Sequence, residues 1–276
     1  MDTTPIQSYT PEQLAQRRQE RAVRRRRKKL MQGVILFIGF VALVLVLMGV
    51  RTIWKWTEGA RARSRYGTGN YDVSEYVFRA SDPRLVLVNQ YCSVSTSTAP
   101  ELEVADDATG QQLAPEAAEA FRNMVQAAAE EKIKLSLGSG YRDTLTQDNL
   151  FQKLMERYTV QGYSQEEAKA IAWTVTEKGG YSEHQTGYAA DIVTDDYPVP
   201  DSEFAKTKAY AWLVRYAPEY GFILRYPEER QAATGHIEQP WHWRYVGVDN
   251  AQAITASGLS LEEFLALHTA QETPAE

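Results

Sequence analysis

The stretch Ser182-Glu-His-Gln-Thr-Gly-Tyr-Ala-Ala-Asp191 places a histidine, a glycine and an aspartate within ten residues. Fifty-one residues after Asp191, His242 stands in the sequence Pro-Trp-His-Trp-Arg-Tyr. Two imidazoles and one carboxylate can hold a divalent metal, usually zinc, by three bonds and leave a fourth position open for water or substrate. An open position distinguishes a catalytic metal site from a structural one.

The residues around these donors suit a metal site. Gly187 allows the chain to turn tightly between His184 and Asp191, and the small Ala189 and Ala190 leave room beside them. The alternative is that both histidines pack in the core or lie on the surface, which is the commoner role of a single histidine. A histidine followed seven residues later by an aspartate is a weak motif alone. The flanking motifs therefore decide between the two interpretations.

Four motifs occur in a fixed order along the chain. They are Ser139 to Arg142 followed by Gln147, Gly180 to Gly187, Tyr220 to Pro227, and Pro240 to Gly247. In these motifs the chain resembles the VanY-type D-alanyl-D-alanine carboxypeptidases, zinc peptidases that trim peptidoglycan stem peptides and include L,D-carboxypeptidase relatives. The resemblance covers roughly residues 110 to 250. Four ordered motifs are hard to obtain by chance.

The resemblance implies roles for individual residues. His184, Asp191 and His242 take the positions of the Zn²⁺ ligands. Arg142 takes the position of an arginine that stabilises the oxyanion or holds the substrate, and a planar guanidinium suits both tasks. An ordinary salt bridge is the alternative role for this arginine. The weaker candidates, for hydrogen bonds to the peptide, are Ser182 and Gln147.

One position departs from the family pattern. The family carries a glutamate three residues before the last histidine, where it takes a proton from the attacking water and passes it to the leaving amine. This chain has Gln239 there. An amide keeps the shape of the carboxylate but cannot accept a proton at ordinary pH. General acid–base catalysis contributes about 10² to 10⁴ in rate, so a strict interpretation predicts a severely slowed enzyme.

Glu238, next to Gln239, is a possible substitute base. Adjacent side chains of an extended strand point to opposite faces, so Glu238 would need a bulge or register shift at Pro240 to reach the water. Two hypotheses follow. The first is a membrane-anchored zinc carboxypeptidase that removes the terminal D-alanine from stem peptides, with D,D or L,D specificity. The second is a catalytically impaired relative that binds cell-wall peptides as a sensor or scaffold.

Charge is distributed unevenly along the 276 residues. Up to Arg65 the chain has 14 Lys and Arg against 4 Asp and Glu, and the remainder has 16 against 32. Nine of the basic residues lie between positions 17 and 29, directly before an apolar segment. A basic run can bind nucleic acid, but this position favours the flank of a membrane span, so we expect no nucleic-acid partner.

Residues 30–50 form an uncharged stretch of 21 residues, long enough to cross a bilayer. A cleaved signal peptide would have a shorter apolar core and a small-residue cleavage site. Trp54 and Trp56 follow the stretch and suit the membrane interface. We therefore expect an uncleaved, single-pass helix in the cell membrane, with the N-terminus in the cytoplasm and the C-terminal domain outside, although five basic residues beyond the span weaken this orientation.

The sequence divides into five segments. They are a cytoplasmic basic tail (1–29), a transmembrane helix (30–50), a stalk (51–74), a peptidase domain (75–268) and a polar tail (269–276). Cys92 is the one cysteine and so forms no internal disulfide. We expect it to be a small buried residue rather than a nucleophile.

Hydrophobic periodicity predicts the elements of the domain. Helices are expected over 115–132, 143–162, 164–178, 205–220 and 261–267, and strand-like segments over 85–89, 134–138, 221–225 and 241–246. The metal motif follows the third helix as a loop and strand, and Ser164 with Glu167 forms a possible capping box. The predicted class is α+β, a small antiparallel sheet with flanking helices that carries the zinc site and follows one transmembrane helix.

Overall fold

The structure is a computed structural model that describes residues 64–94 and 100–272, with scattered positions between 31 and 62. The chain forms two compact units, Met1–Trp54 and Lys55–Glu276. The expected basic tail, most of the expected span and the last four residues lie outside the described part. Within the described part, we find no helix with the length and apolar character that crossing a bilayer requires. The membrane helix stays a prediction.

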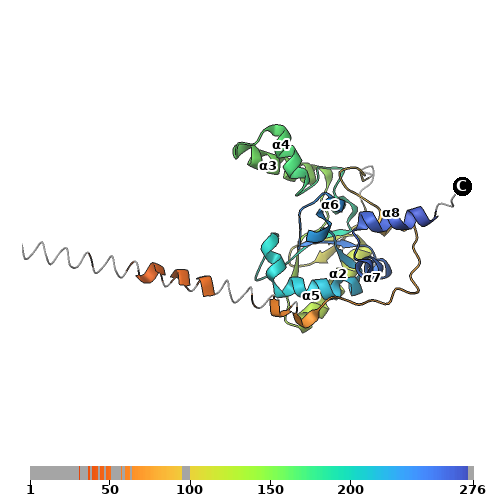
Figure 1. The fold of residues 1–276 in the computed structure, drawn as a ribbon, viewed down its shortest axis with the longest axis horizontal. Coiled ribbons are helices and arrows are strands. Elements are labelled where there is room, and N and C mark those ends of the chain that lie inside the picture. Colours follow the sequence, from red (N-terminus) through yellow and green to blue (C-terminus); the bar gives the residue numbers. More distant parts are fainter. Residues whose placement is uncertain are drawn as a thin grey trace, which may run out of the picture. The chain divides into compact units, whose positions relative to one another are not determined.

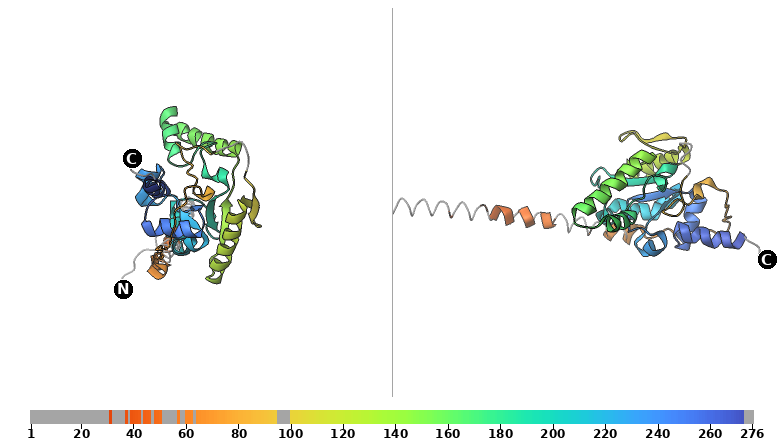
Figure 2. Two further views of the ribbon diagram at one scale, coloured as in Figure 1. Left: turned by 90° about the vertical axis from the view of Figure 1, so that its right-hand side faces the viewer. Right: turned by 90° about the horizontal axis from the view of Figure 1, so that it is seen from above.

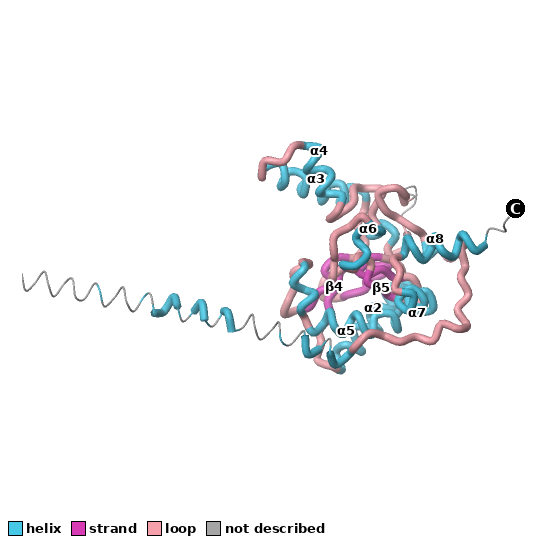
Figure 3. The backbone as a smooth tube through the Cα atoms, in the orientation of Figure 1, coloured by secondary structure: helices cyan, strands magenta, loops and turns pink. Residues whose placement is uncertain are grey.

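A four-stranded antiparallel sheet forms the centre of the Lys55–Glu276 unit (Figures 1 and 3). Its strand order is β3-β4-β6-β5. The strands are β3 (Leu135–Ser139), β4 (Ala189–Thr194), β6 (His242–Tyr245) and β5 (Phe222–Leu224), and a separate hairpin pairs β1 (Glu103–Asp106) with β2 (Gln111–Leu113). Asp191 and His242 therefore lie on the two central strands, β4 and β6.

Helices surround the sheet, and four of the five expected helices are present among them. The α-helices are α2 (Pro115–Glu130), α3 (Thr144–Val160), α4 (Gln165–Trp173), α5 (Lys208–Tyr216), α6 (Gln231–Thr234), α7 (Val248–Ser257) and α8 (Leu261–Glu272). The 3₁₀ helices are η1 (Pro83–Leu85), η2 (Glu183–Thr186), η3 (Ser202–Lys206), η4 (Ala217–Tyr220) and η5 (Glu228–Arg230). The predicted α+β class is confirmed.

Alternation along β6 separates the core from the site. Trp243 and Tyr245 join the main apolar cluster, whereas His242 and Arg244 alternate with them and therefore point to the opposite face. The main cluster is made by Phe121 and Met124 of α2, Trp212 and Leu213 of α5, and Leu135, Leu137, Ile192 and Phe222 of the sheet. Burial of the apolar residues thus fixes which β6 side chains face the site.

A second apolar cluster packs α7 and α8 against β5. It contains Ile223 of β5, Ala251 and Ile254 of α7, and Leu261 and Phe264 of α8. Phe222 and Ile223 are adjacent in sequence but belong to different clusters, as the alternation of a strand requires. The two clusters hold β5, and through it β6, from both faces.

The α3–α4 hairpin stands at the top of this unit in Figure 1 and in the left view of Figure 2. Asp143 caps α3 by accepting a hydrogen bond from the backbone N–H of Thr146 at 2.7 Å. Ser164 and Glu167 form the predicted capping box at the start of α4. Helix α4 ends at Trp173, earlier than expected, and a loop then leads to the metal motif.

Three local predictions were wrong. Residues 85–89 form no strand, because Asp82 caps the short helix η1 and Pro83 occupies its first turn. Residues 205–220 are not one helix, since Thr207 caps a new helix and Pro218 begins η4. Cys92 is exposed rather than buried, in a turn held by the side chain of Asn89.

Candidate metal centre

The sheet register brings two of the three predicted metal donors together. Asp191 of β4 is paired with His242 of β6 and with Ser139 of β3. His184 approaches from η2, which is capped by the side chain of Ser182. Gly187 ends η2 with φ of +77°, and a side chain there would come within 2.9 Å of the backbone nitrogen of Ala114. The turn into β4 therefore requires glycine.

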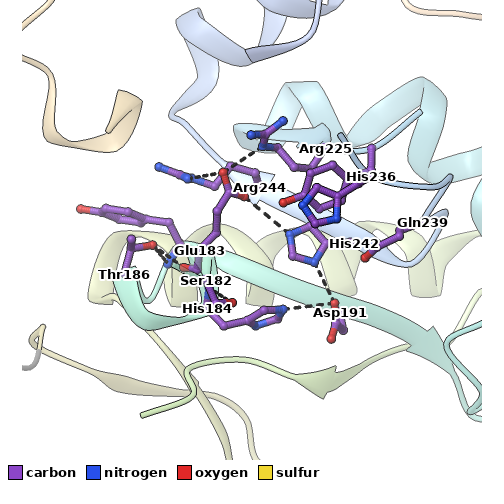
Figure 4. A network of polar contacts seen from close by, with 12 residues as sticks. Ser182, Glu183, His184, Thr186, Asp191, Arg225, His236, Gln239, His242 and Arg244 are labelled. Atoms are coloured by element: carbon purple, nitrogen blue, oxygen red, sulfur yellow. Dashed lines mark hydrogen bonds and ion pairs between the residues drawn. The ribbon is translucent and has the colours of Figure 1, made fainter. Parts of the chain in front are cut away.

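The three donors converge as the sequence predicted (Figure 4). One ligand atom from each of His184, Asp191 and His242 lies within 4.8 Å of the other two, and all three residues are buried. His184 Nε2 is 3.3 Å from Asp191 Oδ1, and His242 Nδ1 is 3.0 Å from the same oxygen. These distances are within reach of a single ion.

A hydrogen bond orients the imidazole of His184 for metal binding. His184 Nδ1 lies 2.6 Å from the carbonyl oxygen of Gly140, so it carries the hydrogen and leaves a lone pair on Nε2. Among the described residues, His184 Nε2 has no hydrogen-bond partner although it is buried. A buried acceptor without a partner is costly, and a metal would satisfy it. The donor set therefore fits a divalent metal such as zinc.

Glu183 supports the second imidazole from behind. Its Oε2 lies 3.6 Å from His242 Nε2, on the opposite side of the ring from Asp191. A carboxylate behind a ligating histidine fixes the ring orientation and makes the histidine a stronger ligand. The sequence motifs assign Glu183 no role in the metal site, although it directly precedes the first metal donor.

Two arginines hold Glu183 in place. Arg225 Nε and Arg244 Nη1 each lie 2.8 Å from Glu183 Oε1, and all three side chains are fully buried. Arg225 also binds Glu262 of α8 through two hydrogen bonds of 2.9 and 2.6 Å. Arg244 donates to the carbonyl oxygens of Arg84 and Val86 at 2.8 and 3.0 Å. The network thus ties the metal centre to η1 and α8.

Electrostatics keep both carboxylates of the centre ionised. Burial raises the pKa of Asp191, but His184 and Arg142 outweigh it and hold this pKa well below the ordinary value. Burial also raises the pKa of Glu183, and Arg225 and Arg244 lower it further than burial raises it. Asp191 therefore offers an ionised oxygen as a metal donor, and the charge of Glu183 is balanced by its two arginines.

The two imidazoles differ in protonation when no metal is bound. Burial, together with the charge of Arg142, lowers the pKa of His184. Burial also lowers the pKa of His242, but the carboxylates of Asp191 and Glu183 raise it to about 9. The proton on His242 Nδ1, 3.0 Å from Asp191 Oδ1, occupies the lone pair with which this nitrogen would bind a metal, so metal and proton compete there.

Arg142 lies directly beside the metal donors. Its Nη2 pairs with Asp191 Oδ2, its Nε donates to Ser139 Oγ at 2.8 Å and its Nη1 donates to Gln147 Oε1 at 3.3 Å. These contacts use three of the five guanidinium N–H groups, which leaves two for a ligand. The side chain is 15% exposed, so it is reachable from the solvent side of the site.

The two predicted peptide-binding residues are engaged within the protein. Gln147 is fully buried, accepts from Arg142, and donates from Nε2 to Thr176 Oγ1 and the carbonyl oxygen of Glu177 at 3.0 and 2.6 Å. It therefore positions Arg142. Ser182 is also fully buried and caps η2 through the backbone N–H of His184. Their contact with a peptide stays a prediction.

Gln239 is buried, and its side chain is a donor. Its Nε2 donates to the carbonyl oxygen of Val175 at 2.9 Å. Glu238 is half-buried, and burial with the neighbouring Glu228 and Glu229 raises its pKa. Its charged neighbours thus belong to the η5 segment, and its role as a substitute base stays a prediction.

A further buried pair lies close to the metal centre. Glu177 and His236 contact each other at 3.0 Å, and neither residue was singled out from the sequence. A polar residue between a helix and a loop is usually solvent-exposed, so the sequence pattern gives no signal for this pair. The pair is recognised only in the fold, which buries both Glu177 and His236.

Comparison with known proteins agrees with this fold and site. The family model for VanY, D-alanyl-D-alanine carboxypeptidase, matches residues 110–248. The chain belongs to this family.

Relatives and solved structures of the family match the same region. A D-alanyl-D-alanine carboxypeptidase of Enterococcus faecalis is 34% identical over 181 residues, which are 66% of this chain and 65% of that protein. A structure of a vancomycin-resistance D,D-pentapeptidase VanY mutant in complex with Zn(II) is 34% identical, with a TM-score of 0.59, and covers 66% of this chain and 98% of its own. The LdcB LD-carboxypeptidase is 29% identical, with a TM-score of 0.56, over 67% of this chain and 86% of its own.

Proposed function

We propose that this chain is a zinc-dependent carboxypeptidase that removes the terminal D-alanine from peptidoglycan stem peptides, from either pentapeptides or tetrapeptides. The observation that carries the proposal is the convergence of His184, Asp191 and His242, with the His184 ring oriented by a hydrogen bond to Gly140 and the His242 ring backed by the Glu183 carboxylate at 3.6 Å. Membership of the VanY family and the Zn(II) complex of a similar protein support it.

The side chains of the site have different roles in the proposed hydrolysis. A bound zinc ion would lower the pKa of its water and polarise the scissile carbonyl. Arg142 offers two remaining N–H groups to the developing oxyanion or to the peptide carboxylate. Gln147 holds Arg142 in position, and the Glu183 network holds His242. These fixed donors need no reorganisation during the reaction.

D-alanine release by the full-length protein tests the proposal. We expect release from a stem pentapeptide or tetrapeptide in the presence of zinc, and loss of release after chelation and in Asp191→Asn. Asp195→Asn is the matched control, since Asp195 is an exposed residue outside the donor set. No release from either peptide, with zinc bound stoichiometrically, would contradict the proposal.

A catalytically impaired peptide-binding protein is the second candidate function. The observation that favours it is the Gln239 side chain, which donates to Val175 and cannot accept a proton. In this case Gln239→Glu should raise turnover by about 10² to 10⁴, while the exposed Gln231→Glu should leave it unchanged. A Gln239→Glu variant with the turnover of the wild type would show that Gln239 does not limit the site.

We propose further that residues 30–50 anchor the protein in the cell membrane and that the Lys55–Glu276 unit lies outside the cytoplasm. The 21-residue uncharged stretch and the nine basic residues between positions 17 and 29 support this orientation. Membrane fractionation, followed by protease treatment of intact and permeabilised spheroplasts, tests it. Cleavage of the C-terminal unit only after permeabilisation would contradict the orientation.

A further inference from the structure

Glu177 and His236 form a buried carboxylate–imidazole pair outside the metal-donor set. Glu177 lies in the loop after α4 and His236 in the loop after α6. Glu177 Oε1 is 3.0 Å from His236 Nε2 and accepts a hydrogen bond from the Tyr226 hydroxyl at 3.1 Å. The two residues are only 6% and 3% exposed. The carboxylate therefore keeps the hydrogen on Nε2 and leaves the lone pair on Nδ1.

The lone pair on His236 Nδ1 has no partner among the residues that the structure describes. A buried polar atom left without a partner costs free energy, so a water or a ligand is required there. An imidazole with one nitrogen held by a carboxylate and the other presenting a lone pair is the arrangement of an oriented general base.

The pair lies one aromatic ring away from a metal donor. The ring centroid of Tyr226 is 4.3 Å from that of His236 and 4.9 Å from that of His242. Figure 4 shows His236 and Gln239 in the same part of the site as His242. Burial, followed by Glu177 and Glu183, raises the pKa of Tyr226 well above its ordinary value, so its hydroxyl remains a donor to Glu177.

Backbone contacts fix the two loops that carry the pair. The N–H of Ile237 donates to the carbonyl oxygen of Thr174 at 2.9 Å, next to the contact between Gln239 and Val175. On its other side, Glu177 accepts through its carbonyl oxygen from Gln147, which also holds Arg142. The pair is therefore connected to both the metal donors and the arginine of the site.

The other buried acids of the centre already have partners and cannot serve as the base. Asp191 belongs to the donor set and pairs with Arg142, and Glu183 is neutralised by two arginines. Gln239 cannot accept a proton. Burial raises the pKa of Glu177, but its hydrogen bond with His236 lowers it below the ordinary value, so Glu177 is ionised and stabilises a charged imidazole.

We propose that His236, held by Glu177, accepts the proton of the attacking water and returns it to the leaving amine. This inference rests on the proposed hydrolytic function. In the first half, a water O–H bond breaks, the oxygen keeps the electron pair and bonds to the carbonyl carbon, and the proton binds the lone pair of His236 Nδ1. In the second half, the C–N bond breaks, the nitrogen keeps the pair and takes the proton from His236. Transfer across one bridging water serves the same purpose.

Replacement of His236 in the zinc-loaded, full-length protein tests the role. We expect His236→Gln to lower kcat for D-alanine release by about 10² to 10⁴, with KM and zinc content unchanged. His268→Gln is the matched control, because His268 of α8 stacks on Phe78 at 4.9 Å, among residues of the second apolar cluster. Zinc content and thermal melting establish that each variant is folded.

Replacement of Glu177 gives a measurement that a merely structural role would not change. Glu177→Gln keeps the shape of the pair but removes the charge that stabilises the imidazolium, so the acidic limb of the kcat–pH profile should move to lower pH. Nitrogen NMR of histidine-labelled protein should show the tautomer of His236 with its hydrogen on Nε2 and a lone pair on Nδ1, independently of turnover. The charged groups that surround this imidazole are Glu177 directly and, around the Tyr226 ring, Arg225, Glu183 and His242.

The outcomes separate the base role from the hydrolytic function. An active wild type whose His236→Gln variant keeps kcat within about threefold overturns the base role alone. An acidic limb of the kcat–pH profile that does not move in Glu177→Gln also overturns the base role. If His236→Gln does not fold, the Glu177→Gln variant alone decides whether His236 is the base. A wild-type protein that binds zinc but releases no D-alanine overturns the proposed function and the base role with it.

Discussion

Replacement of Glu183 by glutamine should weaken zinc binding without removing any metal donor. Glu183 lies behind His242 at 3.6 Å and is held by Arg225 and Arg244 at 2.8 Å each. Glutamine keeps the shape and can still accept from the imidazole, but it removes the negative charge. Loss of a supporting partner of a metal ligand costs about 10- to 100-fold in affinity, or about 1.4 to 2.8 kcal/mol. We expect the lower part of this range.

The same variant should be less stable even without zinc. All three side chains of the Glu183 ion pairs are fully buried, so removing one charge leaves two arginines without their shared partner. Arg225 keeps Glu262, whereas Arg244 keeps only backbone carbonyl oxygens. Breaking a buried ion pair costs about 3 to 5 kcal/mol, which denaturant unfolding of the zinc-free protein would measure.

Glu262→Gln is the matched control. Glu262 also pairs with Arg225, at 2.6 Å, but is 15% exposed and lies on the far side of that arginine from Glu183. We expect it to lower the free energy of unfolding by about 1 to 3 kcal/mol and to change zinc affinity by less than about threefold. Chelator competition measures the affinities of both variants. Equal losses of zinc affinity in the two would refute the argument that Glu183 supports the metal through His242.

Three further predictions concern the metal centre. In zinc-free protein, burial lowers the pKa of His242, but its two carboxylate partners raise it from 6.5 to about 9. Protonated His242 therefore contributes stability that is fully present below about pH 6.5 and is lost as the pH rises to about 9. Melting temperatures of zinc-free protein should fall across this interval, above the range in which the lowered pKa of His184 opposes the effect. Saturating zinc should remove most of this fall and raise the melting temperature at every pH. At a zinc concentration of 100 times the Kd, the free energy of unfolding should rise by about 2.7 kcal/mol. Gly140→Ala would drive a Cβ into the backbone carbonyl oxygen of Gln112, so it should lower the free energy of unfolding by about 1 to 3 kcal/mol and weaken zinc binding through His184. Gly138→Ala has a methyl group of Val193 as its nearest contact, at 3.3 Å, so it should cost less stability and leave zinc binding unchanged.

The sequence predicted the elements whose signals are local. Helix α2 follows from apolar spacing with a proline in its first turn, and α4 begins at a capping box visible as Ser164 and Glu167. The convergence of His184, Asp191 and His242 also follows from the sequence, because ordered motifs define these residues, and their role as metal ligands stays a prediction. In each case the information lies within a few neighbouring residues or one motif.

The elements that were missed depend on contacts between distant segments. The apolar run at 85–89 has the composition of a strand, but the carbonyl oxygens at 84 and 86 instead accept from Arg244, which is 158 residues away from the latter. Glu183, Arg225 and Glu262 are charged residues that a sequence pattern places on the surface. Glu183 and Arg225 are fully buried and Glu262 is 15% exposed, because each neutralises another, and such pairing appears only in the fold.

The departure at Gln239 has a different meaning in the fold than in the motif. In the motif, loss of a carboxylate three residues before His242 removes the expected base. In the fold, the residue three positions before Gln239 is His236, whose Nδ1 is buried without a partner while Glu177 holds its other nitrogen. A chain that had only lost its base would keep an inactive site and gain nothing by burying a second ionisable pair beside it, since such a pair costs desolvation energy. Measuring Gln239→Glu and His236→Gln in parallel separates the two cases, because a relocated base predicts little gain in the first variant and a large loss in the second.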